Sequence, residues 1–428
     1  MQRYSGFRFS GLIGASVMAL MAAVGWSQPS LTWLGTLRGQ DWIGSMALDV
    51  VDCPCSREAP RLLVVGAALN YGGFPRAIVW TPSAGMQALP TLTGGNVGSA
   101  AFGISTDGLV IVGSSIGDPR WIRPVRWIGN TVADLGTLGG TEGVAFATSK
   151  DGSIVVGWAD NEYGSPTAFR WENGMMRNLG TLPGRGNSGA TGISADGSVI
   201  AGISGDLFVA FRWDSASQQM RMLPLPPGCE VSVAYRTSRD GSVIAGGIFN
   251  INTGTLEAVR WVDDHVQVIG TLNGLDSIAY DVSADGSIVV GGAGDIDEFL
   301  DEYFLGSRVA AIRWTASGGM EDLNITYADL LRDGSSLQAA FGISASGQYI
   351  VGWGYNATTG RTEAYLLDTC VHNGDINCDG EVDDNDLLQA LFAFGNSGSN
   401  LGRVDVNCDR IVDDTDLLIV LFNFGSRC

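Results

Sequence analysis

Two stretches near the C-terminus carry the oxygen ligands that a calcium ion prefers. Each is twelve residues long, and they begin 30 residues apart, at Asp375 and Asp405. Calcium takes roughly six to eight hard oxygen ligands, which a loop of this length supplies at positions 1, 3, 5, 7, 9 and 12, with a backbone carbonyl at position 7. The predicted ligands are Asp375, Asn377, Asp379, Glu381 (carbonyl), Asp383 and Asp386 in the first loop, and Asp405, Asn407, Asp409, Ile411 (carbonyl), Asp413 and Asp416 in the second.

The two predicted sites differ at the sharp turn of the loop. The first loop has Gly380 there and the second has Arg410. A residue with a Cβ costs about 1 kcal/mol or more in a left-handed conformation, so we expect two calcium ions with the second bound more weakly. From Gly374 onward there are 11 acidic and 3 basic residues, and we expect their repulsion to loosen this segment without calcium. A purely structural calcium staple is an equally open interpretation.

Short helices are the elements expected to position these loops. Each loop is followed by apolar residues in matching positions, and a glycine, Gly395 or Gly425, is expected to end the helix. The matching residues are Leu387, Leu388, Leu391, Phe392 and Phe394, and Leu417, Leu418, Leu421, Phe422 and Phe424. A single loop and helix cannot bury its apolar face, so we expect the two to pack on each other. No helix is expected before either loop.

This pair of loops and helices resembles a type I dockerin domain over residues 374–428. The resemblance implies two calcium ions, and a partner of cohesin type or a role in extracellular polysaccharide breakdown. The residues before each last ligand, which tend to carry partner recognition in that family, are Asp384-Asn385 and Asp414-Thr415. Both pairs differ from the family's Ser-Thr type.

The rest of the chain is built from three signatures that recur in a fixed order. The first is a Ser-x-Asp-Gly hairpin followed by a β-branched run, and the Asp-Gly pair is a strong signal for a tight turn. It begins at Ser105, Ser149, Ser194, Ser238 and Ser283, with a variant at Ser344. The second is a strand ending at Trp80, Trp127, Trp171, Trp213, Trp261 and Trp314, with a degenerate copy at Ala364–Leu367. The third is Leu-Gly-Thr-Leu or a variant, beginning at Leu34, Leu89, Leu135, Leu179, Leu223, Ile269 and Leu323.

The spacing of these signatures predicts a mainly β fold. A period near 44 residues with four short strands is typical of a propeller blade. The chain opens with the third signature and the repeats end with the second, so the N-terminal strand is expected to complete the last blade. We therefore predict a seven-bladed β-propeller closed by its N-terminal strand, followed by a small α-helical domain with EF-hand-type calcium loops. An open solenoid is the alternative.

The repeats resemble the HAF-repeat family of extracellular proteins over residues 31–368. The likeness lies in Leu-Gly-Thr-Leu, Ser-x-Asp-Gly-Ser-x-Val-x-Gly and Ala-Phe-Arg-Trp, although the His that gives the family its name is absent before Ala-Phe. The resemblance implies secretion and little defined activity. Two interpretations stay open for each of two features. The hairpins are either turns or sites for calcium or sugar, and the tryptophans either pack between blades or form sugar platforms.

The N-terminus and the composition point to an exported protein. Arg3 and Arg8 precede an apolar run, which predicts a signal peptide over residues 1–27, the propeller over 28–368 and the dockerin-like domain over 369–428. No other segment is apolar for the length of a membrane span, and the net charge of −20 excludes nucleic acid as a partner. Seven cysteines favour disulfides. Cys370, Cys378, Cys408 and Cys428 allow three pairings, and at least one thiol among Cys53, Cys55 and Cys229 lacks a local partner.

These features favour a noncatalytic binding or structural module over an enzyme. The partner is expected to be a protein, of cohesin type if the resemblance holds, or a glycan. The alternative is a polysaccharide-active protein, which needs two carboxylates about 5–10 Å apart. No such pair stands out, so no catalytic residue is predicted. Long insertions near Asp52–Pro60 and Gly294–Ser307 are candidate recognition loops, and Asp297 and Glu298 would be the acids to test.

Overall fold

Antiparallel strands dominate the computed structural model. It describes residues 29–39, 42–52, 62–72, 74–93, 98–118, 121–294, 309–377, 381–398, 401–407 and 411–426. Within these residues, five sheets have four strands each and a sixth has eight. The fold is therefore mainly β, as the repeats predict.

The four-stranded sheets follow one another along the chain. They are β6 (Ser99–Ile104), β7 (Val110–Ile116), β8 (Ile122–Ile128) and β9 (Thr131–Asp134); β10 (Gly139–Thr148), β11 (Ile154–Asn161), β12 (Pro166–Glu172) and β13 (Met175–Gly180); β14 (Ser188–Ile193), β15 (Val199–Ser204), β16 (Val209–Asp214) and β17 (Gln219–Met222); β18 (Cys229–Thr237), β19 (Val243–Asn250), β20 (Thr255–Val262) and β21 (His265–Gly270); and β22 (Asp276–Val282), β23 (Ile288–Gly294), β24 (Ala310–Thr315) and β25 (Gly319–Asp322).

The eight-stranded sheet joins the two ends of the repeat region. It contains β1 (Ser30–Gly35), β2 (Trp42–Asp52), β3 (Leu62–Asn70), β4 (Pro75–Thr81) and β5 (Gly85–Ala88), together with β26 (Ser336–Ile343), β27 (Tyr349–Asn356) and β28 (Arg361–Asp368). The link between its halves is one parallel pair, Gly44 with Thr362. β1 pairs antiparallel with β28, from Ser30 opposite Asp368 to Gly35 opposite Ala364. The predicted pairing of the N-terminal strand with the last repeat is therefore confirmed.

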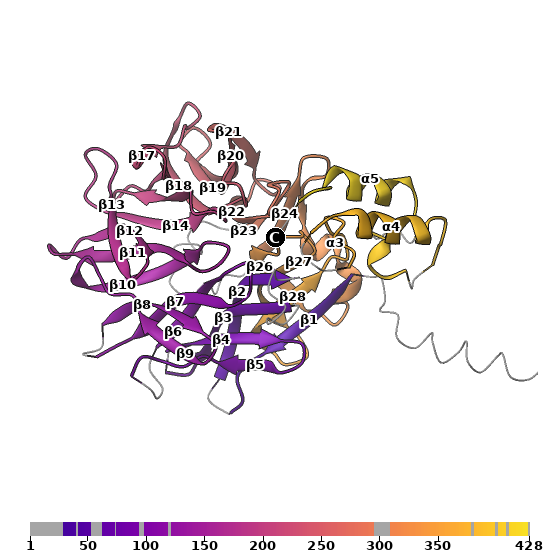
Figure 1. The fold of residues 1–428 in the computed structure, drawn as a ribbon, viewed down its shortest axis with the longest axis horizontal. Coiled ribbons are helices and arrows are strands. Elements are labelled where there is room, and N and C mark those ends of the chain that lie inside the picture. Colours follow the sequence, from indigo (N-terminus) through magenta and orange to yellow (C-terminus); the bar gives the residue numbers. More distant parts are fainter. Residues whose placement is uncertain are drawn as a thin grey trace, which may run out of the picture.

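The sheets form a closed ring around a channel. Each sheet contacts the next, and β2 contacts β26, β27 and β28, so the last sheet returns to the first. Figure 1 shows the sheets arranged radially. The first strand of each repeat (β2, β6, β10, β14, β18, β22 and β26) lies nearest the channel, and the later strands lie further out. This arrangement of sheets is a β-propeller.

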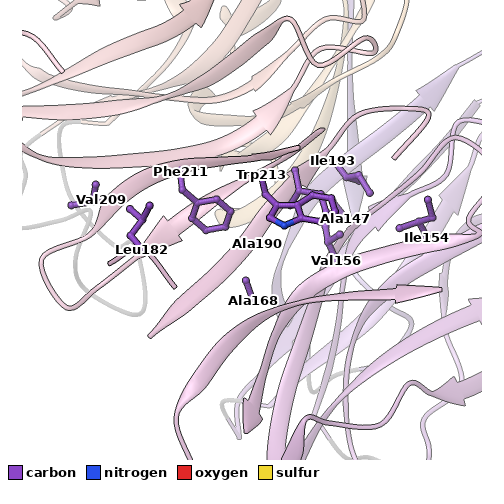
Figure 2. Packing of buried hydrophobic residues seen from close by; sticks show 11 residues of the cluster. Ala147, Ile154, Val156, Ala168, Leu182, Ala190, Ile193, Val209, Phe211 and Trp213 are labelled. Atoms are coloured by element: carbon purple, nitrogen blue, oxygen red, sulfur yellow. The ribbon is translucent and has the colours of Figure 1, made fainter. Parts of the chain in front are cut away.

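Apolar side chains from neighbouring sheets fill the space between them. Phe211 and Trp213 of β16 pack against Ile154 and Val156 of β11, a strand of the preceding sheet (Figure 2). The repeated tryptophans Trp80, Trp127, Trp171, Trp213, Trp261 and Trp314 are all at most 9% exposed. The inter-sheet packing interpretation of these tryptophans is confirmed, because side chains this buried offer no sugar platform.

An arginine precedes five of the six repeated tryptophans, and four of these arginines, Arg126, Arg170, Arg212 and Arg260, contact the next sheet. The guanidinium of Arg260 lies 4.5 Å from the ring centroid of Trp314 in the next sheet. Its Nη1 also donates to the carbonyl of Gly286, in the hairpin of that sheet, at 2.7 Å. Arg170 and Arg212 donate in the same way to Gly197 and Gly241. The arginine of the repeat thus adds a contact between neighbouring repeats.

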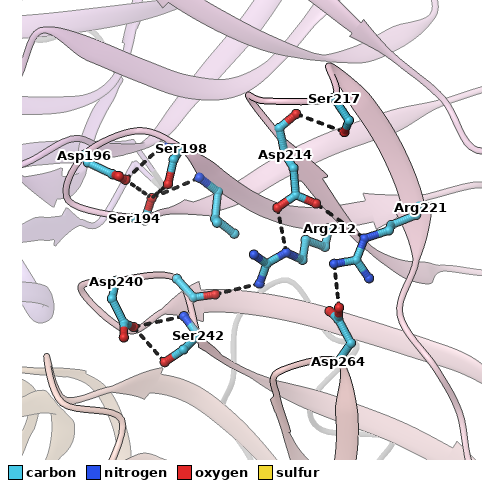
Figure 3. Close-up of polar contacts among 12 residues, drawn as sticks. Ser194, Asp196, Ser198, Arg212, Asp214, Ser217, Arg221, Asp240, Ser242 and Asp264 are labelled. Carbon is cyan, nitrogen blue, oxygen red and sulfur yellow. Dashed lines mark hydrogen bonds and ion pairs between the residues drawn. The ribbon is translucent and has the colours of Figure 1, made fainter.

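The Ser-x-Asp-Gly hairpins are stabilised by their own side chains. In the repeat of Ser194, the hydroxyl donates to Asp196 at 2.7 Å, and the Ser198 amide donates to the same carboxylate oxygen at 2.9 Å (Figure 3). These hydrogen bonds lower the pKa of Asp196 against the opposing effect of burial. Gly197 has φ +72°. The motif is therefore turn chemistry, as the first of the two interpretations states.

The Leu-Gly-Thr-Leu signature, which was expected to be a strand, is one only in part: β1, β13 and β21 end at its glycine (Gly35, Gly180 and Gly270), whereas the other four copies follow the strand. β5, β9 and β17 end before Leu89, Leu135 and Leu223, and Leu323 begins the helix α3 (Leu323–Thr326), which is followed by η1 (Ala328–Leu331). These leucines are at most 6% exposed. The glycines that follow in several copies have positive φ, for example +87° at Gly136. The motif therefore turns the chain out of the fourth strand while its leucine stays in the core.

Two helices form the C-terminal module, which we define as residues 369–426. α4 (Asp384–Ala393) and α5 (Asp414–Phe422) follow the two acidic loops, and each begins with a capping box, at Asp383 and Asp413. A short 3₁₀ turn, η2 (Gly402–Val404), precedes the second loop, where no helix was expected. Gly395 and Gly425 lie just beyond the helices with φ near +85°.

The helices pack together through fewer apolar residues than predicted. Leu387, Ala390, Leu417 and Val420 lie in the module's core. The other matched residues are exposed, with Phe392 at 86% and Phe422 at 83%. The two helices do pack on each other, as predicted, but each has a narrow buried face, and the remaining matched positions point away from it.

Several sequence predictions lie outside the described residues. They are the signal peptide (1–27), the insertion at 53–61 and the insertion at 295–308. Within the part of the chain that the structure describes, no helix has the length and apolarity needed to cross a membrane.

Candidate functional site

A ring of side chains faces the channel because every channel strand carries a β-bulge. The register of each strand shifts just before its hairpin, for example between Ala101 and Gly103 in β6 and between Ala279 and Asp281 in β22. A bulge leaves a residue outside the ladder and redirects its side chain. The residues at this place are Leu48, Phe102, Phe146, Thr191, Tyr235, Tyr280 and Phe341.

These side chains line a cavity of about 800 Å³, which we call the aromatic cup. Phe102 and Phe146 meet edge to face with ring centroids 5.2 Å apart, and Tyr280 lies 5.3 Å from Tyr235 and 5.0 Å from Phe341. The wall is completed by residues nearer the mouth, including Trp158, Gly189, Ile203, Phe208, Val231 and Phe249. A largely apolar cavity of this size is typical of a small-molecule site.

One arginine forms the floor of the aromatic cup. Arg236 follows Tyr235 in β18, and its Nη2 donates to the carbonyl of Phe102 at 2.6 Å while its Nη1 donates to that of Phe146 at 3.2 Å. The guanidinium also lies 3.8 Å from the Asp49 carboxylate. Arg236 therefore reaches across the channel to three other sheets.

Two aspartates, Asp49 and Asp281, interact electrostatically with Arg236. Asp49 Oδ2 accepts from the Ile104 amide at 3.0 Å, and Asp281 Oδ2 accepts from the Ile343 amide at 2.9 Å. In both cases the amide belongs to the next sheet, so each carboxylate links two neighbours. Burial raises the pKa of Asp281 to about 7, although Arg236 opposes this, and burial also raises the pKa of Asp49.

A second, smaller cavity lies on the other side of this floor. It measures about 140 Å³ and is lined by Arg236, Asp49, Asp281, Lys150 and Arg239, among others. Its lining is polar, whereas the lining of the aromatic cup is apolar. The charged floor thus divides the channel into an apolar chamber and a polar chamber.

The C-terminal module contacts the ring on its hairpin face. A cavity of about 420 Å³ lies between hairpin residues such as Asp285 and Ser346 and module residues such as His372 and Asp375. Arg403 of the module donates to the Gln348 side chain at 2.5 Å and to the Asp375 carbonyl at 2.8 Å. Burial lowers the pKa of His372 well below its usual value, so this histidine is neutral in the interface. The mouth of the aromatic cup lies on the opposite face, because the channel strands run from the mouth toward the hairpins.

Most predicted calcium ligands lie within the described residues, but Asp379 and Asp409 do not. Asp386 is fully buried, and its carboxylate accepts from the amides of Ile376, Asn377 and Asp383. Asp416 repeats this pattern with Val406, Asn407 and Asp413. The last ligand of each loop therefore lies against the beginning of that loop, as a calcium loop requires.

The donor set fits a calcium ion. Asp375, Asp386, Asp405 and Asp416 are each at most 5% exposed. A buried carboxylate needs a positive partner or strong hydrogen bonds, and the contacts described for Asp386 and Asp416 are all with backbone amides. Within the described residues, no group of three or more His, Cys, Asp or Glu forms a ready metal cluster, but position 5 of each loop is outside them.

The cysteine predictions are tested only in part. Cys229 is a free, buried thiol, which confirms that one member of the set Cys53, Cys55 and Cys229 lacks a partner. Of the C-terminal four, only Cys370 lies within the described residues. Their pairing stays a prediction.

Sequence reasoning missed the channel site. Each channel strand reaches Ile-Ser or a variant of that pair near its end. The residues just before the pair are Asp49, Gly103, Ala147, Gly192, Arg236, Asp281 and Gly342. Four of these seven residues are Gly or Ala and three are charged. A charged residue at a position that is otherwise small was the available signal.

Comparisons with known proteins add the fold and no activity. The chain matches no protein-family model and no curated protein. It is similar to an oligogalacturonate lyase in complex with manganese (12% identity, 80% of this chain, 98% of that chain, TM-score 0.47). It is also similar to the β-propeller domain of the Trilobed protease from Pyrococcus furiosus (9% identity, 76% of this chain, 96% of that chain, TM-score 0.46). A third similar structure is the WD40 β-propeller domain of Doa1 (14% identity, 79% of this chain, 97% of that chain, TM-score 0.43). Similarity at this level indicates neither a ligand nor an activity.

Proposed function

We propose that this protein is a secreted, noncatalytic seven-bladed propeller that binds a ligand, with a dockerin-like module that binds two calcium ions. The observation that carries the calcium proposal is the pair of fully buried carboxylates at Asp386 and Asp416. Three backbone amides hold each carboxylate against the beginning of its loop, and a calcium ion in the loop would add the positive charge that a buried carboxylate favours.

The proposal of seven blades is supported by the way the eight-stranded sheet divides. Only the Gly44–Thr362 pair joins its halves. With that pair set aside, the halves are two four-stranded units, β2–β5 and β26–β28 with β1. These units and the five four-stranded sheets make seven repeats, which equals the number of Leu-Gly-Thr-Leu signatures in the sequence.

The module is also suited to attachment to another protein, which in the dockerin family is a cohesin. Phe392 and Phe422 occupy matching positions on α4 and α5 and are more than four-fifths exposed. Leu388 and Leu418, also matched, are each 48% exposed. Paired apolar residues on two related helices give an attachment surface with two similar halves.

Calcium titration of the full-length chain tests the proposal. We expect calorimetry to show two saturable sites, with the second weaker because of Arg410. Asp375→Ala should abolish the first site and Asp405→Ala the second. The matched control is Asp384→Ala, an exposed acid at position 10 of the first loop that is not a predicted ligand.

The outcomes separate calcium binding from general attraction to an acidic protein. If Asp384→Ala lowers affinity as much as Asp375→Ala does, the binding is diffuse and the two-loop proposal fails. Absence of any saturable binding also rejects the proposal, and leaves the carboxylates of the module without their counter-ion.

A further inference from the structure

The geometry of the channel points to a specific class of ligand for the aromatic cup. We infer that the cup binds a small, uncharged and mostly apolar molecule that places one hydrogen-bond acceptor, such as a carbonyl oxygen, against Arg236. This inference rests on the proposed binding function of the propeller and gives it a ligand class. It does not depend on calcium binding.

The wall of the aromatic cup selects an apolar body. Five of the seven ring residues at the bulges are Phe or Tyr, and a sixth is Leu48. The seventh, Thr191, has its hydroxyl engaged, because it donates to the Ala234 carbonyl at 2.7 Å. A sugar needs a partner for each hydroxyl that it buries, and unpaired polar groups cost about 1–3 kcal/mol each. Apart from the phenol hydroxyls of Tyr235 and Tyr280, the seven ring residues thus offer a buried ligand no free polar group, so the wall is poorly suited to a glycan and well suited to a hydrocarbon chain or an aromatic ring.

The floor supplies the polar contact. Arg236 lines both chambers of the channel, whereas Asp49 and Asp281 line only the polar chamber. Among the residues that the structure describes, two carbonyl oxygens, those of Phe102 and Phe146, accept from the guanidinium. The remaining N–H groups can donate to one further acceptor.

The charges around the floor favour an uncharged acceptor. The Asp49 carboxylate lies 3.8 Å from the Arg236 guanidinium, so the positive charge of Arg236 already has a negative partner. The chain as a whole carries a net charge of −20, which disfavours the approach of an anion. A cation would meet Arg236 at the bottom of the cup, without a carboxylate lining the same chamber.

The mouth of the cup allows entry. Phe208 lies at its edge and is 44% exposed, and the neighbouring Leu207 is 68% exposed. Both belong to the turn between β15 and β16, on the face opposite the C-terminal module. The volume of about 800 Å³ is within the usual range for small-molecule sites.

A fluorescent displacement experiment on the full-length chain tests the inference. The probe is N-phenyl-1-naphthylamine, a neutral aromatic molecule whose emission rises in apolar surroundings. We expect one saturable site. Among competitors with the same chain length, 2-decanone should displace the probe at least about tenfold better than decanoate or decyltrimethylammonium.

Variants locate the probe. A Cβ on Gly189 would make ordinary contacts with Trp158 in the wall, at 3.6 Å, so Gly189→Leu should fit the backbone, fill the cup and abolish probe binding. Gly186→Leu is the matched control, because a Cβ there meets open space and the residue does not line the cup. Arg236→Met should retain the probe but remove the advantage of 2-decanone over decane, and a thermal melt checks that this variant is folded.

Two further results would overturn the inference. Loss of the probe in a Phe392→Ser/Phe422→Ser double variant would place it on the module, and tighter binding of either charged competitor would reject the uncharged ligand class. Asp375→Ala and Asp405→Ala should leave probe binding unchanged. Calorimetry with calcium tests the calcium proposal and probe displacement tests this inference, so the two can fail independently.

Discussion

At the scale of single residues, the channel departs from the repeat. Three channel strands carry a charged residue, Asp49, Arg236 or Asp281, where the other four carry Gly or Ala. A glycine at this position, such as Gly192, lies close to the next strand, because a Cβ on it would be 2.5 Å from the Tyr235 carbonyl oxygen. The charged residues are tolerated because each bonds to the backbone of another sheet. Their side chains bridge sheets in the middle of the ring, where a charge without partners would be costly.

Asp281 should make stability depend on pH. Its pKa is raised to about 7 in the folded protein, from 3.8, so the folded state binds more protons between about pH 4 and 7. The free energy of unfolding contributed by this group therefore falls as pH rises through that window. In Asp281→Asn this fall between pH 5 and pH 8 should be absent, a difference from the wild type of about 3 kcal/mol, because each of the two pH units from 5 to 7 contributes about 1.4 kcal/mol.

Urea denaturation at the two pH values, at constant calcium, measures this difference. Asp329→Asn is the control, because its side chain is exposed and far from the channel. If Asp281→Asn and the wild type show the same pH dependence, the carboxyl does not titrate as the structure indicates.

At the scale of elements, the hairpin glycines serve both the turn and the packing of sheets. Gly241 has φ +73°, and a Cβ on it would lie 2.6 Å from Val199 Cβ in the preceding sheet. Its carbonyl accepts from Arg212 of that same sheet. The hairpin is therefore held at a fixed distance from its neighbour.

Alanine at two glycines separates these effects. Gly254 has almost the same φ, +70°, but a Cβ there meets nothing within 4 Å. Gly254→Ala should cost about 1 kcal/mol from the left-handed conformation alone, whereas Gly241→Ala should cost about 2–4 kcal/mol because the clash adds to it. Chemical denaturation compares the two. Equal losses would mean that the sheets shift apart freely at this hairpin.

At the scale of the whole molecule, one strand closes the ring. β1 supplies the fourth strand of the last sheet, and Trp33 packs edge to face on Tyr365 with ring centroids 6.3 Å apart. Without β1, the edge of β28 would be exposed to other chains.

Deletion of residues 1–36 should therefore lower the thermal midpoint by at least about 10 °C and cause association, because the hydrogen bonds and core contacts of β1 are lost together. Deletion of residues 1–28, which leaves β1 in place, is the control. Thermal melts and size-exclusion chromatography measure both effects. A monomeric protein with an unchanged midpoint would show that the ring does not depend on this strand.

The sequence by itself determined the features that depend on neighbouring residues. The Asp-Gly turns, the period of the repeats, the buried tryptophans, the closing strand and the helices after the acidic loops all follow from local patterns, and the structure contains them. Local pattern was less informative about helix faces, since Phe392 and Phe422 are exposed.

Only the tertiary structure decided where the channel residues meet. Arg236 and the Phe102 carbonyl are 134 residues apart in sequence and 2.6 Å apart in space. A bulge in each channel strand turns the side chains inward, and closure of the ring brings seven strands around one axis. A contact of this kind depends on the curvature of the whole assembly, which no local pattern specifies.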